Sequence, residues 1–306
     1  MGLTFGISLG TQMVFSGPDE IIDIARTLEA LEFDDVWFSE RVCSAALDPL
    51  GALGFIAGST KRLGFGTSVL VVPGRNPVLL AKQLSTIDFL SKGRLRLAVG
   101  LGGVNAAEQQ AFGVRRDERA PWFEEALPLI RRLWAEDDVS HNGKRFVLDS
   151  VTVLPRATQT RLPVWLGGSS PSEYRRAGRL GDGWLGSMLT ATEFRAGRIA
   201  AESAAAESRG EHARSQFGAG FVLRYSMGDR GPDVRQLIAR HRPNATISDL
   251  VPSGRAELSE MLEDLQEAGA SRFILVPGDQ PQSWEEELHW LSETIRPIRA
   301  KGLHGE

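Results

Sequence analysis

The sequence predicts an α/β protein, a (β/α)8 TIM barrel whose alternation of strands and helices is interrupted by two insertions. Apolar segments of strand length alternate with amphipathic segments of helical length along almost the whole chain. The apolar segments are continuous, as expected of parallel strands that are buried on both faces. Eight such βα units close a barrel, whereas a doubly wound sheet typically has five or six strands.

The predicted strands are apolar runs that end at turns containing Gly or Pro. They cover residues 3–9, 36–38, 63–72, 94–99, 163–166, 183–186, 218–225 and 272–276. The predicted helices follow them one by one and cover residues 18–31, 49–60, 77–90, 121–135, 171–180, 190–208, 254–268 and 283–298. Helical spacing of apolar residues supports these segments, as at Ile21, Ala25 and Leu28 in the first helix. The pairs Asp48-Pro49 and Asn76-Pro77 mark helix starts, because proline is favoured in the first turn.

Two segments break the alternation. Residues 141–155 contain Asn142-Gly143 between polar residues and a β-rich stretch at 146–154, which predicts a hairpin inserted after the fourth helix. Residues 228–252 are polar, hold three prolines and predict a long loop or second insertion after the seventh strand. We expect residues 1–306 to form one barrel domain.

Composition excludes several classes of protein. A net charge of −4 argues against a dedicated nucleic-acid binder, and no apolar run approaches the roughly 20 residues of a membrane helix. The N-terminal residues lack the basic and apolar regions of a secretory signal. Cys43 is the only cysteine, which suits a reducing cytoplasm, and the scattered histidines lead us to expect no metal.

The active site of such a barrel lies at the carboxyl ends of the strands. The string Gly167-Gly168-Ser169-Ser170 follows the fifth strand and leads into Pro171 at a helix start. Glycines let the backbone approach an anion, and the free N–H groups of a helix N-terminus favour phosphate. An ordinary helix N-cap with turn glycines explains the same residues, so the residues alone leave both interpretations open.

A second glycine-rich tip, Gly100-Leu101-Gly102-Gly103, follows the fourth strand. A flat ring system fits against a backbone without Cβ atoms, whereas a flexible loop is the alternative interpretation. The string lacks the full spacing of a dinucleotide fingerprint.

Glu40 and Arg41 end the second strand and are the candidate catalytic residues. One interpretation is an acid–base carboxylate beside a contact for an anion. The other is an ordinary salt bridge at the rim of the barrel. Nothing in the sequence has the arrangement of a Ser-His-Asp nucleophile elbow.

Four strings, taken together, resemble the luciferase-like flavin and deazaflavin oxidoreductases. Their order and spacing match that family from near residue 1 to about residue 190, and more loosely beyond. The strings are Asp48-Pro49-Leu50 with Thr60-Lys61-Arg62-Leu63-Gly64-Phe65-Gly66-Thr67, Arg75-Asn76-Pro77 to Arg94-Leu95, Val99-Gly100-Leu101-Gly102, and Leu162-Pro163-Val164-Trp165-Leu166-Gly167-Gly168 to Gly181-Asp182-Gly183-Trp184.

The resemblance implies a cofactor on the barrel axis, with its ring against strands three and four and its phosphate against residues 167–170. It further implies that Thr67, Ser68 and Val69 form a bulge behind the ring, with a cis peptide between the last two. The strings at residues 75–77 and 181–184 are most similar to the coenzyme F420 branch, which transfers hydride between a deazaflavin and a small organic substrate.

Two alternatives stay open beside the F420 branch. One is an FMN-dependent monooxygenase that takes reduced flavin from a separate reductase and uses O2. The other is a non-catalytic flavin-binding barrel. The family resemblance also implies a homodimer.

The sequence departs from the family at two positions. Arg41 stands where members often carry histidine, and Gly103 stands where sugar-phosphate-oxidising relatives carry glutamate. Both changes argue against a sugar-phosphate dehydrogenase and leave the proton donor or acceptor unassigned. Glu40 is the first candidate for that role, with Asn105 and Glu108 behind it.

Overall fold

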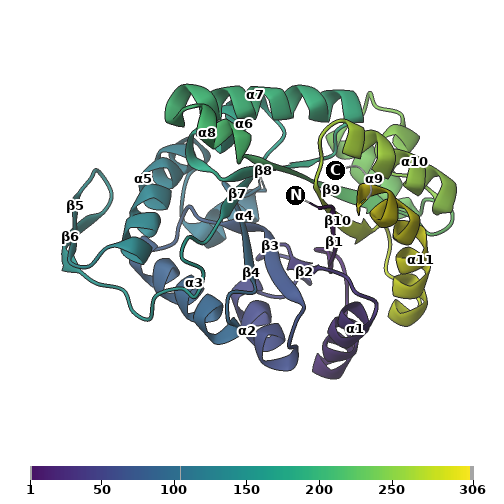
Figure 1. Cartoon of the computed structure of the whole chain (residues 1–306), viewed down its shortest axis with the longest axis horizontal. Coiled ribbons are helices and arrows are strands. Elements are labelled where there is room, and N and C mark those ends of the chain that lie inside the picture. The colour runs from purple at the N-terminus through teal and green to yellow at the C-terminus, as the bar shows by residue number, and fades with distance from the viewer. Residues whose placement is uncertain (1, 104, 304–306) are drawn as a thin grey trace.

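The computed structural model describes residues 2–103 and 105–303. Its parallel strands form a closed barrel in the order β1-β10-β9-β8-β7-β4-β3-β2, which confirms the predicted fold (Figure 1). The strands are β1 (Thr4–Ser8), β2 (Asp35–Phe38), β3 (Gly64–Val71), β4 (Leu95–Gly100), β7 (Val164–Gly167), β8 (Gly183–Ser187), β9 (Gly218–Tyr225) and β10 (Arg272–Pro277).

Helices surround the barrel in the expected alternation (Figure 1). They are α1 (Pro18–Ala30), α2 (Pro49–Ser59), α3 (Pro77–Ser91), α5 (Arg116–Ala135), α6 (Pro171–Leu180), α7 (Ala191–Arg209), α10 (Gly254–Glu267) and α11 (Trp284–Leu303). The predicted helix starts at Pro49 and Pro77 are capped by the residues before them. The Asp48 side chain accepts the N–H of Gly51, and the Asn76 side chain accepts the N–H of Val78. No helix within the described ranges is both long and apolar enough to cross a membrane.

Of the two interpretations of residues 228–252, the second insertion is confirmed and the long loop is wrong. This segment contains α9 (Pro232–His241) and the short 3₁₀ helix η1 (Ile247–Asp249). Val234 and Ile238, four residues apart on α9, are buried in one apolar cluster with Leu250 and Val251. Prolines are typical of loops, but Pro232 occupies the first turn of α9, where proline is favoured.

Two further helices were not predicted, α4 (Ala106–Phe112) and α8 (Glu211–Ser215). Helix α5 also begins five residues before its predicted start at Pro121, which lies inside the helix. The preference of proline for the first turn made it a false start signal.

The predicted hairpin is confirmed as β5 (Val139–Asn142) and β6 (Val147–Val151), which project away from the barrel (Figure 1). Glu125 of α5 holds it, since its carboxylate accepts the N–H groups of Arg145 and Phe146 at 3.1 Å and lies 3.2 Å from His141 Nε2. These contacts hold the hairpin on the helix layer rather than at the strand tips.

Two indole rings occupy the amino-terminal half of the barrel interior. The guanidinium of Arg272 lies over both rings, 5.6 Å from the centroid of Trp37 and 4.9 Å from that of Trp165. Glycines on the surrounding strands provide the space, because a Cβ atom at any of them would lie within 3 Å of one of the two indoles. These glycines are Gly6, Gly66, Gly183, Gly218 and Gly220.

Replacing Gly218 by alanine tests this packing. The added Cβ would overlap the six-membered ring of Trp165, so we expect the free energy of unfolding to fall by about 1–3 kcal/mol, measured by urea denaturation. Gly58→Ala on α2 is the control, because its Cβ meets open space and alanine favours the helix. An unchanged midpoint for Gly218→Ala would contradict the packing argument.

Candidate active site

Val69 lies at the centre of the carboxyl-terminal face. The pairing of β3 with β4 shifts register between Thr67 and Leu70, and the Ser68–Val69 peptide is cis, as predicted. The Val69 side chain packs on the interior cluster that contains Trp37. A Cβ atom at Gly100 or at Gly167 would lie 2.8 Å from a Val69 methyl carbon. Val69 therefore fills the space beside these two glycines, which lets β3, β4 and β7 pack together here, while the Val69 side chain itself stays partly exposed.

The glycine tip after β4 is held by Arg119 of α5. This side chain is only 2% exposed, and its Nη1 donates to the carbonyls of Leu101 at 3.2 Å and Gly103 at 2.7 Å. Gly102 between them has a φ of 82°, in the left-handed region that favours glycine. The loop therefore has a defined conformation, imposed by a residue that the sequence analysis missed.

The predicted phosphate loop already binds a carboxylate. The N–H groups of Ser169 and Ser170 donate to Glu173 Oε2 at 2.9 and 3.0 Å, and the Ser170 hydroxyl donates to the same oxygen. The Ser169 hydroxyl donates to the Ser187 carbonyl. This is a capping box at the start of α6, as the N-cap interpretation expects. These donors suit an anion, but a phosphate can reach them only when the Glu173 side chain moves.

Glu40 forms hydrogen bonds to the backbone on both sides of the β3 bulge. Its N–H donates to the Val69 carbonyl at 3.2 Å, its Oε2 accepts the N–H of Val71 at 2.6 Å, and its Oε1 pairs with Arg75 Nη2. The side chain is 3% exposed, and burial raises the pKa of the carboxyl group while Arg75 opposes the rise. Both oxygens are therefore engaged with protein groups. Arg41 is exposed and is not the partner of Glu40.

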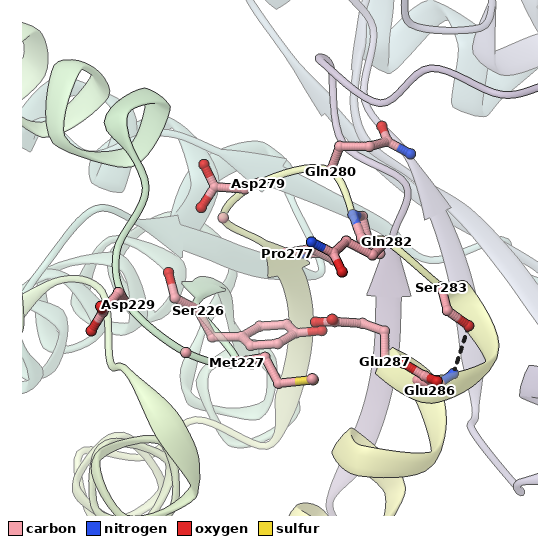
Figure 2. A pocket seen from close by; sticks show the side chains of 14 residues that line it. Ser226, Met227, Asp229, Pro277, Asp279, Gln280, Gln282, Ser283, Glu286 and Glu287 are labelled. Carbon is pink, nitrogen blue, oxygen red and sulfur yellow. Dashed lines mark hydrogen bonds between the residues drawn. The ribbon is translucent and has the colours of Figure 1, made fainter.

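Two cavities flank the end of β10, and they differ in charge. The axial cavity, about 480 Å³, is lined by Ser169, Arg224 and Val276 among others, with no carboxylate among its described lining residues. The second cavity, about 210 Å³, lies beside the ends of β9 and β10 and the segments that follow them (Figure 2).

The cavity of Figure 2 is acidic. Four carboxylates line it, from Asp229, Asp279, Glu286 and Glu287, and no arginine, lysine or histidine is among its described lining residues. Coulomb repulsion disfavours a phosphate-bearing molecule there. Of the two cavities, the axial cavity is therefore the one that suits an anionic ligand.

Sequence reasoning also missed Arg75 and Arg224. Arg75 begins the string at residues 75–77, but no local pattern pairs it with Glu40, which is distant in sequence. Arg224 carried a usable signal, because it interrupts an apolar strand two residues after Val222 and therefore shares its face. Asp182, from the string at residues 181–184, supports β7: it accepts the N–H of Val164 and pairs with Arg131.

The sequence profile of the luciferase-like monooxygenase family matches residues 4–291. Among curated proteins, the chain is similar to two named F420-dependent glucose-6-phosphate dehydrogenase. The one from Microbacterium testaceum is 31% identical over 60% of this chain, and the one from Kineococcus radiotolerans 33% identical over 55%. The matched segments span 56% and 52% of those proteins, little more than half of their length.

Solved structures share the fold over nearly the whole chain. An F420-dependent secondary alcohol dehydrogenase superposes with a TM-score of 0.83 at 18% identity, covering 97% of this chain and 99% of that one. The coenzyme F420-dependent tetrahydromethanopterin reductase from Methanopyrus kandleri superposes with a TM-score of 0.79 at 17% identity, covering 97% of this chain and 99% of that one.

Replacing Arg75 by methionine leaves the Glu40 carboxylate buried without its counter-charge. We expect the free energy of unfolding at pH 8 to fall by about 3 kcal/mol. Because burial holds the pKa of folded Glu40 above its ordinary value, the folded state takes up this proton more readily than the unfolded state. The loss should therefore shrink as the pH falls from 8 toward about 4.3, the ordinary pKa of glutamic acid.

Urea denaturation of Arg75→Met at pH 8 and pH 5 measures this dependence. The double variant Glu40→Gln/Arg75→Met is the control, since it buries no charge and should recover part of the stability lost at pH 8. Equal losses at the two pH values would contradict the assignment to Glu40.

Proposed function

Because the chain belongs to the luciferase-like monooxygenase family, we propose that it is an oxidoreductase that uses coenzyme F420 to transfer hydride to or from a small organic substrate. We place the cofactor ring against the partly exposed Val69 side chain, which Gly100 and Gly167 seat between β4 and β7, and this arrangement carries the proposal. The names of the similar curated proteins support F420 as the cofactor.

In this proposal the deazaflavin supplies the carbon that accepts or releases hydride. The protein contributes orientation: Val69 and the two glycines support the ring, and Arg119 sets the conformation of residues 101–103. Glu40, proposed as a catalytic residue from the sequence, has its carboxylate bound to Val71 and Arg75, which suits it to fix the bulge under the ring. Arg41 is proposed at the exposed rim, where an incoming substrate passes.

The substrate proposed is small and partly apolar rather than a sugar phosphate. Gly103 and Arg41 replace the glutamate and histidine that the family resemblance implies for sugar-phosphate oxidation. The axial cavity is lined in part by Leu189, Val222 and Leu250, which contribute apolar surface. Such side chains exclude water from the reacting atoms and select an apolar substrate body.

A fluorescence titration with coenzyme F420 and with FMN tests the proposal. We expect saturable binding of F420 at or below tens of micromolar, and weaker binding of FMN. Gly100→Ala should weaken F420 binding at least ten-fold, because the new Cβ pushes against Val69. Gly54→Ala on α2, whose Cβ meets open space, is the matched control. Tighter binding of FMN would overturn the choice of cofactor.

Replacing Glu173 by glutamine tests whether the loop at residues 167–170 receives the cofactor phosphate. Removing one negative charge about 4 Å from a phosphate should tighten F420 binding roughly five-fold. The same deazaflavin ring without its phosphate should bind both proteins equally. Equal changes for the two compounds would place the phosphate elsewhere.

We also propose that the chain forms a homodimer in the cytoplasm and that a separate reductase supplies reduced cofactor. Large apolar side chains on α2 and α3 are exposed, including Phe55 at 38%, Leu79 at 63% and Leu90 at 67%. Such a cluster suits a self-association surface. Sedimentation equilibrium should give a dimer for the wild type and a monomer for Leu79→Glu/Leu90→Glu; a wild-type monomer would reject the proposal.

A further inference from the structure

Arg224 is a charged side chain without an ion-pair partner inside the barrel mouth. It lies on β9 on the inward face shared with Val222, and it lines the axial cavity. Its Nη1 donates to the carbonyl of Pro277 at 3.0 Å. Among the described residues, no carboxylate lies within 4 Å of its guanidinium nitrogens, and Asp279 acts on it only from longer range.

Such a placement is unfavourable without a ligand. Burial disfavours the charged guanidinium and lowers its pKa, although arginine keeps its proton at neutral pH. Arg224 is half-buried and faces the cavity, and an arginine with such restricted access to water is usually paired with a carboxylate or another anion. A single carbonyl leaves most of the donors of Arg224 unused, and the cavity lies in front of them.

The other groups that face Arg224 across the cavity define the ligand. Arg242 and His241 add positive or neutral polar surface at the end of α9. Arg242 is itself occupied, since it pairs with Glu193 and donates to the carbonyl of Met188. Apolar side chains make up much of the remaining wall. The cavity therefore suits an oxyanion attached to a small apolar body, with Arg224 as its free cation.

We propose that Arg224 binds a carboxylate or phosphate group of the substrate, so that the enzyme selects small amphipathic organic anions. This inference rests on the proposed function for the position of the cofactor, whose ring and phosphate are assigned to β3, β4 and β7. Strand β8 separates β7 from β9 in the barrel, so Arg224 stands on the wall left to the substrate.

The test compares three probes of equal chain length, hexanoate, hexyl phosphate and hexanol, by calorimetric titration of the F420-loaded and cofactor-free protein. We expect wild type to bind at least one of the two anions ten-fold or more tightly than hexanol. Arg224→Met should lose this preference, whereas Arg224→Lys should keep part of it. Arg240→Met is the matched control, because Arg240 is exposed on α9 and does not line the cavity.

The expected affinity of Arg224→Met for F420 is within two-fold of wild type. A ten-fold loss of F420 affinity, with anion binding retained, would assign Arg224 to the cofactor phosphate and overturn the inference. Equal binding of anions and hexanol by wild type, or an unchanged preference in Arg224→Met, would also overturn it. If Arg224→Met does not fold, Arg224→Gln replaces it.

If the protein does not use F420, the titrations give a different pattern from the one that overturns the role of Arg224. Wild type would then fail to bind F420, while the cofactor-free protein would still bind the anionic probe in an Arg224-dependent manner. The two failures are therefore distinguishable in one set of titrations.

Discussion

The filling of the barrel interior is the constraint on which the rest of the structure depends. Trp37 and Trp165 occupy its amino-terminal half, with the cation of Arg272 over both rings. Small residues on the facing strands make this possible, because any Cβ atom there would meet an indole. Since this half is closed by packing, the axial cavity lies at the carboxyl-terminal half, where residues at the ends of β7, β8, β9 and β10 line it.

The polar groups around that open half are matched by side chains from neighbouring elements. The β3 bulge withdraws backbone groups from the ladder, and Glu40 accepts the N–H of Val71 in compensation. Arg119 donates hydrogen bonds to two carbonyls of the glycine tip after β4. Glu173 accepts hydrogen bonds from two N–H groups of the tip after β7. Buried backbone groups need such partners, so these charged residues fix the shape of the site whatever their role in catalysis.

Arg224 differs from Glu40 and Arg242 in having no ion-pair partner among the residues that the structure describes. Glu40 is bound to Arg75, and Arg242 to Glu193, so their charges are neutralised within the fold. The free cation in the axial cavity and the carboxylates in the cavity of Figure 2 give the two sides of β10 opposite charge. Electrostatics therefore divides the mouth of the barrel into regions that accept and reject anions.

The sequence by itself determined all eight strands, the helices that begin at Pro49 and Pro77, and the tips at residues 100–103 and 167–170, because periodicity, capping and glycine placement are local properties. It did not determine which groups those tips contact. Three features depend on distances between residues remote in sequence. They are the ion pair of Glu40 with Arg75, the hydrogen bonds from Arg119 to the glycine tip, and the lack of a counter-charge beside Arg224. Only closure of the barrel brings such groups together or leaves a cation such as Arg224 without a counter-charge among the described residues.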